Sequence, residues 1–162
     1  MPVFISHRTA DDKLAQQVAF RLKQQHGIEC YLDDIDQELK KAQGTPAVTG
    51  LIVRRLNQCT NLLAIVTINT EGSWWVPFEV GVARQAPRVI TTFTNQEDSS
   101  LPAYLLEWPR LRGDSAIDEF AKLYKAQQQI LRANVLEKRA LAAEQVSVVD
   151  QFHRQLKARL GQ

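Results

Sequence analysis

The stretch NLLAIVT, residues 61–67, is an uninterrupted, mostly apolar run in the middle of a chain of 162 residues. Leucine, isoleucine and valine dominate it, and apolar and polar residues do not alternate along it. Strands that are covered on both faces show this pattern, whereas strands with one solvated face alternate. We therefore expect residues 61–67 to form the central strand of a sheet with helices on both faces.

Four other segments have the β-branched, aromatic and apolar composition of strands. They are PVFIS (2–6), IECYL (28–32), RVITTF (88–93) and a short edge segment around Pro109 (106–111). Helical patterns separate these segments, and such alternation predicts right-handed crossovers and a parallel sheet. The predicted fold class is α/β, a flavodoxin-like three-layer sandwich with a central parallel five-stranded sheet and extra C-terminal helices.

The chain after residue 130 continues as helix. Ser147 begins an S-x-x-D cap, and a final short helix is lined by Phe152, Leu156 and Leu160. Residues 121–162 hold eight lysines and arginines against three acidic residues, an excess that could bind an acidic partner. Because the excess is only about 3 to 1, we favour a solvated helical face or a self-association surface. We divide the chain into a domain of residues 1–130 and a helical extension, 131–162, that packs on it or serves assembly.

Composition sets the expected compartment and excludes some partners. A formal net charge of +2 is too small to indicate nucleic acid, and no apolar run approaches the ~20 residues of a membrane helix. The N-terminus lacks the pattern of a signal peptide, so the expected location is the cytoplasm, without a membrane partner. Cys30 and Cys59 lie in apolar segments and are expected to be reduced core thiols.

Several kinds of chemistry lack their sequence motifs. The glycines form neither a G-x-G-x-x-G pattern nor a P-loop, which argues against kinases, ATPases and ordinary dehydrogenases. The three histidines are too widely spaced for a zinc site, so we expect no metal, and there is no G-x-S-x-G elbow. A receiver domain would need an aspartate at the end of its third strand, where this chain reads VTINT.

Polar residues follow three of the predicted strands at the points where those strands end. They are Ser6, His7 and Arg8, then Asp33 and Asp34, and then the segment 73–79. The carboxyl edge of an open α/β sheet is where ligands bind. We therefore expect the functional site at this edge.

The segment SWWVPFE, residues 73–79, places a carboxylate in apolar company. If Ser73 caps a helix, Trp75 and Glu79 are four residues apart on one face, and the carboxylate lies against an aromatic wall. Such a carboxylate acts strongly on a positive charge that develops in a substrate. The alternative is that Pro77 is the first helical residue, which leaves Trp75 as a core aromatic outside the helix.

Taken together, VFISHRTADD, GIECYLDD, NLLAIVT and SWWVPFE resemble the Toll/interleukin-1 receptor (TIR) domain family. In that family a strand of the form F-I-S-x-R precedes a helix, and the second strand ends in an aspartate. The third helix begins S-x-W-x-x-x-E, which Ser73, Trp75 and Glu79 match position by position. LPAYLLEWPRL is similar to the family's last strand region, so the resemblance covers about residues 1–130.

The resemblance implies an enzyme that cleaves the nicotinamide glycosidic bond of NAD, with NAD as substrate and no cofactor. By this resemblance Glu79 is the catalytic residue, Ser73 belongs to the substrate-binding motif, and Trp75 walls the ribose or nicotinamide pocket. By position, we expect contacts to phosphates or base from Ser6, His7 and Arg8, and orientation of the following loop by Asp33 or Asp34. The alternatives are a surface ion pair for Arg8, a helix-start hydrogen bond for His7 and turn chemistry for the aspartates.

A stand-alone TIR domain is similar to the TIR components of bacterial antiphage systems such as Thoeris. These make a cyclic ADP-ribose signal, a diffusible nucleotide that reaches a separate effector. The resemblance also implies homo-oligomers through TIR–TIR contacts. Two other functions stay open, namely a non-enzymatic TIR adaptor and an enzyme similar to nucleoside deoxyribosyltransferases, in which Glu79 would attack covalently.

Overall fold

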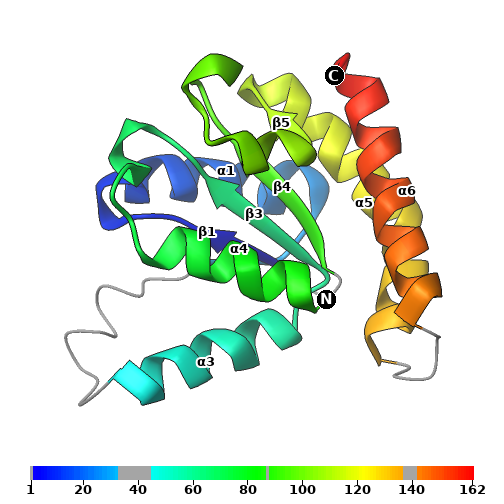
Figure 1. The fold of residues 1–162 in the computed structure, drawn as a ribbon. Helices are drawn as coiled ribbons and strands as arrows, with labels where there is room; N and C mark the ends of the chain where they lie inside the picture. The colour runs from blue at the N-terminus through cyan, green and yellow to red at the C-terminus, as the bar shows by residue number, and fades with distance from the viewer. Residues whose placement is uncertain (1, 33–44, 87, 137–141) are drawn as a thin grey trace.

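A computed structural model describes residues 2–32, 45–86, 88–136 and 142–162. Its sheet has five strands, all parallel, in the order β2-β1-β3-β4-β5 (Figure 1). The strands are β1 (Val3–Ser6), β2 (Cys30–Leu32), β3 (Asn61–Ile65), β4 (Val89–Phe93) and β5 (Arg110–Leu111). The predicted flavodoxin-like α/β fold is confirmed.

Helices cover both faces of the sheet. One face carries α1 (Asp12–His26), α5 (Gly113–Leu136) and α6 (Ala142–Leu160), and the other carries α3 (Thr45–Asn57) and α4 (Trp75–Gln85). Figure 1 shows α3 and α4 in front of the sheet and α1 behind it. Four short 3₁₀ turns lie in the connections: η1 (Thr9–Asp11), η2 (Ile68–Thr70), η3 (Asp98–Ser100) and η4 (Ala103–Glu107).

The predicted central strand is the third in the sheet order, and every residue of β3 is buried. Leu63 and Ile65 belong to the core under α1 and α5, whereas Leu62 and Ala64 belong to the core under α3 and α4. A strand covered on both faces has no solvent side, which explains the absence of polar alternation in its sequence.

The last strand is shorter than the predicted segment 106–111. Leu106 lies in η4, and only Arg110 and Leu111 pair with β4. A two-residue strand leaves the outer backbone groups of β4 without a complete neighbour. The N–H of Ile90 instead donates to Nε2 of His153 on α6, at 3.0 Å.

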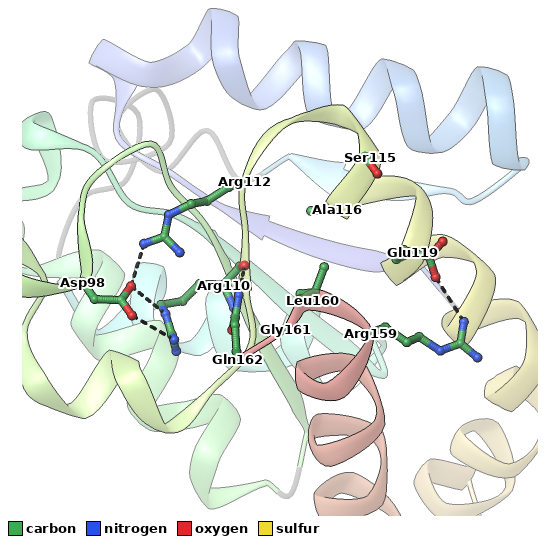
Figure 2. Close-up of a pocket in the computed structure, with 10 residues that line it drawn as sticks. All are labelled: Asp98, Arg110, Arg112, Ser115, Ala116, Glu119, Arg159, Leu160, Gly161 and Gln162. Atoms are coloured by element: carbon green, nitrogen blue, oxygen red, sulfur yellow. Dashed lines mark hydrogen bonds and ion pairs between the residues drawn. The ribbon is translucent and has the colours of Figure 1, made fainter.

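The last residue, Gln162, covers the outer edge of β5. Its side-chain Oε1 accepts the N–H of Arg110 at 3.0 Å, and its Nε2 donates to the carbonyl of the same residue at 2.5 Å. Figure 2 shows this amide beside Arg110. Five residues before Gln162, in the last turns of α6, Lys157 donates to the carbonyl of Leu106 at 2.8 Å. The α6 segment thus occupies the place of a further strand and satisfies exposed edge groups.

The final helix begins at Ala142, five residues before the predicted cap, so the prediction of a helix start at Ser147 is wrong. Ser147 lies exposed inside α6, and the apolar face of the helix joins the core through Phe152 and Leu156. Tertiary packing of that face overrides the local capping signal. The division of the chain at residue 130 stays a prediction; α5 runs through that position.

Within the described ranges, no helix is long and apolar enough to cross a membrane. Cys30 and Cys59 are free thiols, and burial raises the pKa of each to about 12. Both therefore stay protonated and unreactive at neutral pH.

Candidate functional site

The strand order places the topological switch point between β1 and β3. After β1 the chain adds β2 on one side of it, and it then returns to add β3, β4 and β5 on the other side. The loop after β1 and the loop after β3 meet here. Ligands of open α/β sheets bind in the crevice outside the strand ends at such a point. The residues of these two loops therefore form the candidate site, together with α4, which follows the second loop.

A buried carboxylate joins the two loops. Asp11 is 5% exposed and accepts hydrogen bonds from Thr67 Oγ1, at 2.8 and 3.0 Å, and from Asn69 Nδ2, at 2.7 Å. Thr67 also caps η2, because its Oγ1 accepts the N–H of Asn69. Asp11 therefore fixes the turn that leads into α4. The sequence carries no local signal for this role, since an acidic residue near a helix start indicates only a favourable interaction with the helix dipole.

We expect Asp11→Asn to lower the free energy of unfolding by about 1–3 kcal/mol, because an amide would direct a donor at Thr67 or Asn69 and leave buried groups unpaired. Urea unfolding measures the loss. The control is Asp114→Asn, which removes an exposed carboxylate and should cost less than about 1 kcal/mol. Equal stabilities of the two variants would refute the role of Asp11.

The structure shows which bonds His7 and Arg8 make. Arg8 Nη1 donates to the carbonyls of Asn69, at 2.5 Å, and Glu71, at 3.4 Å, and no carboxylate of the described residues pairs with it. The His7 ring lies 3.0 Å from Asp12 Oδ1 at the start of α1, as in the alternative of a helix-start bond. Contacts of either residue with a ligand stay predictions.

The helix that carries Glu79 begins at Trp75. The N-cap residue is Trp74, one position after the predicted Ser73, although Ser73 Oγ accepts the N–H of Val76 at 3.4 Å. Pro77 is the third residue of the helix. Trp75 and Glu79 are thus four residues apart within α4, on neighbouring turns. The alternative in which the helix starts at Pro77 is wrong.

Glu79 and Ser6 lie on the same side of the sheet. Glu79 is 1% exposed and belongs to the buried side of α4, which packs on the face that holds Phe4. Because side chains alternate along a strand, Ser6 points to the same face as Phe4. Ser6 is 0% exposed, and its hydroxyl has no hydrogen-bond partner among the described residues. Two of the predicted site residues thus lie on the same face of the sheet, the face that α4 covers.

A row of small side chains crosses the sheet at this level. Ser6 is in register with Ala64, which is in register with Thr92. The Thr92 hydroxyl is also buried and unpartnered within the described part of the chain. Sequence analysis did not identify Thr92, because a threonine inside a β-branched strand indicates only strand propensity.

The two tryptophans of the motif differ in environment. Trp75 is half-buried against the core under α3 and α4, and its ring meets Phe78 edge to face at 5.9 Å. Trp74 is 89% exposed. The role of Trp75 as a pocket wall stays a prediction. Asp33 and Asp34 lie outside the described residues.

Two cavities open near the carboxyl edge of the sheet. One, of about 560 Å³, lies between the loop after β3, the start of α4 and the segment 96–105; Glu79 does not line it. The other, of about 500 Å³, lies where β5, α5 and the end of α6 meet (Figure 2).

The arginines of the second cavity are already engaged. Asp98 binds Arg110 through Nε and Nη2, at 2.9 and 3.1 Å, and binds Arg112 at 2.6 Å. These arginines hold the pKa of Asp98 below its usual value. Arg159 pairs with Glu119 at 3.4 Å. The Asp98 pairs join η3 to the end of β5, and the Arg159–Glu119 pair joins α6 to α5, so we assign both to structure.

Comparison with curated proteins finds no match to the chain. Among the described residues, no group of three or more histidine, cysteine, aspartate or glutamate side chains is placed to hold a metal ion. The family model described as the TIR domain matches residues 3–126. That match covers β1 through most of α5 and includes every residue of the candidate site. The chain therefore belongs to the TIR domain family.

Proposed function

We propose that this TIR domain cleaves the bond between nicotinamide and ribose in NAD, with Glu79 as the catalytic carboxylate. The TIR family includes NAD-cleaving enzymes as well as adaptors. One observation carries the choice of an enzyme: Glu79 is buried on the sheet face to which the unpartnered Ser6 hydroxyl points, one turn after Trp75. A buried carboxylate and an unpartnered hydroxyl on one face of the sheet suit a substrate-binding site better than an adaptor's contact surface.

The reaction needs only one carboxylate. The C1′–N bond of NAD breaks with its electron pair moving to the pyridinium nitrogen, so nicotinamide leaves as a neutral molecule and no acid has to protonate it. The positive charge stays on the ribose as an oxocarbenium-like cation, which Glu79 stabilises at short range. This differs from ordinary glycosidases, which use a pair of carboxylates.

The group that captures the cation determines the product. Addition of water, with loss of one proton, gives ADP-ribose, whereas attack by a nitrogen of the adenine in the same molecule, again with loss of one proton, gives a cyclic ADP-ribose isomer. We propose the cyclic product, acting as a signal to a separate effector in bacterial antiphage defence of the Thoeris kind. NAD is then a substrate, and the protein holds no cofactor.

The burial of Glu79 has a consequence for substrate access. At 1% exposure the carboxylate meets the ribose only after neighbouring side chains move. TIR domains commonly self-associate, and we propose that contact between copies provides this rearrangement and completes the site. Activity per molecule should then rise with protein concentration.

Chromatography with mass spectrometry of the products from NAD tests the proposal. The expected result is release of nicotinamide with one equivalent of a cyclic ADP-ribose isomer, at a rate per molecule that increases with protein concentration. ADP-ribose alone would support the bond cleavage and refute cyclisation. Intact NAD at every concentration tested would refute the enzyme and favour an adaptor.

A further inference from the structure

The cavity of about 560 Å³ at the ends of β3 and β4 has the size and lining of a small-molecule site. Its walls include the apolar side chains of Val66, Val76, Leu101 and Leu105, and Tyr104 adds an aromatic surface. The Tyr104 ring is held edge to face against Trp108, with 6.3 Å between the centroids. The ring is 43% exposed, so part of its surface is open to a flat ligand.

The charge of the lining excludes anions from the interior. None of the described residues that line the cavity is lysine or arginine, and Glu71 is the one carboxylate among them. No positive side chain of the lining would offset the charge of a phosphate here. The part of a ligand that enters the cavity is therefore an uncharged ring system.

The hydroxyls of Thr67, Thr70 and Ser73 are occupied by bonds to neighbouring residues of the described chain. The Thr70 hydroxyl accepts the N–H of Thr67, and the Ser73 hydroxyl accepts that of Val76. The side-chain amide of Gln96 is different, since no group of the described residues bonds to it. It offers one acceptor and two donors in one plane, a pattern that matches N6 and N7 of adenine.

We propose that this cavity is a binding site for adenosine. The purine stacks on Tyr104 and contacts the aliphatic walls, while Gln96 reads its N6 and N7 edge. The exposed carboxylate of Glu71 accepts hydrogen bonds from the ribose hydroxyls, as acidic residues do in dinucleotide sites. In this orientation the 5′ carbon of the ribose points to solvent. Phosphates attached to that carbon would then lie in water, outside the uncharged interior of the cavity.

Two molecules present this adenosine group: a free adenine nucleoside, or the adenosine half of NAD, the substrate under the proposed function. The cavity lies close to the catalytic helix. Val76 lines it and precedes Glu79 by three residues, about 4.5 Å along the helix axis. The cavity and Glu79 therefore share the first turns of one helix.

The experiment measures binding without turnover, in the Glu79→Gln chain, by calorimetry with adenosine, cytidine and NAD as the three probes. Adenosine should bind at least about 10-fold more tightly than cytidine, because the two-ring purine stacks on Tyr104 over a larger area than the single ring of cytosine. Leu101→Trp fills the cavity and should abolish adenosine binding. Gln96→Leu should weaken it about 10-fold, and the control Gln24→Leu, on the exposed side of α1, should leave it unchanged.

The NAD arm separates the two sources. If NAD binding falls with adenosine binding in both cavity variants, the site holds the adenosine half of NAD; if NAD binding is unchanged, it is a separate nucleoside site. Absence of adenosine binding, equal binding of cytidine, or adenosine affinity unaffected by Gln96→Leu would overturn the proposal. A chain that binds adenosine but never consumes NAD would refute the proposed function alone.

Discussion

Glu79→Gln should lower the turnover of NAD by at least about 10²–10³-fold, the usual loss when one electrostatic stabiliser of a transition state is removed. The substitution keeps the shape of the side chain and removes its charge. A glutamine cannot offset the positive charge that develops on the ribose as nicotinamide leaves. Because glutamine has nearly the size and shape of glutamate, we expect the chain to keep its fold.

Nicotinamide release, followed by chromatography, gives the rate, and circular dichroism with thermal unfolding reports the fold. The matched control is Glu29→Gln, an exposed carboxylate beside Lys23 at the amino end of β2, which should retain full activity. If a folded Glu79→Gln chain still turned over NAD at the native rate, the proposed mechanism would be refuted. Trapping of a ribosylated Glu79 with nucleosides would favour instead the covalent enzyme similar to nucleoside deoxyribosyltransferases.

The sequence predicts the fold well because the sheet is covered by helices on both faces, and this burial gives its strands continuous apolar sequences. β3 is buried along its whole length, and its sequence is correspondingly apolar without alternation. The helix with Glu79 can also be predicted from the sequence, since Ser73 and the four-residue spacing from Trp75 to Glu79 are local signals. Local patterns of this kind survive in a single sequence because each depends on neighbours within a few positions.

Other features depend on contacts between distant segments and leave no local trace. The length of β5 is set by what covers it, and Gln162 and His153 come from a helix far along the chain. Asp11 works through Thr67 and Asn69, more than fifty positions away. The start of α6 follows from the packing of Phe152 and Leu156 rather than from Ser147. Such roles become visible only in three dimensions.

The stability of the fold should fall as pH drops from 7 to 5 because of one histidine. His153 is 7% exposed, and its Nε2 accepts the N–H of Ile90, so the ring is neutral with its proton on Nδ1. Burial lowers the pKa of His153 from 6.5 to about 4, with Asp150 opposing the shift and Lys157 and Arg84 adding to it.

The direction of the effect follows from these two pKa values. The unfolded chain takes up a proton near pH 6.5, whereas the folded chain resists protonation until about pH 4. The stabilising contribution is therefore complete above pH 6.5 and is lost as pH falls toward 4. Between pH 7 and pH 5 the loss from His153 should be about 2 kcal/mol.

Two substitutions distinguish the effect of protonating His153 from the effect of its hydrogen bond to Ile90. His153→Gln retains an oxygen that can accept the N–H of Ile90 but does not titrate, so it should remove about 2 kcal/mol of the pH dependence. His153→Leu leaves that buried N–H without an acceptor and should cost about 1–3 kcal/mol at pH 7. Urea unfolding at pH 7 and pH 5 gives all six free energies. Equal pH dependence in the native chain and His153→Gln would show that His153 does not hold α6 on the sheet through a neutral ring.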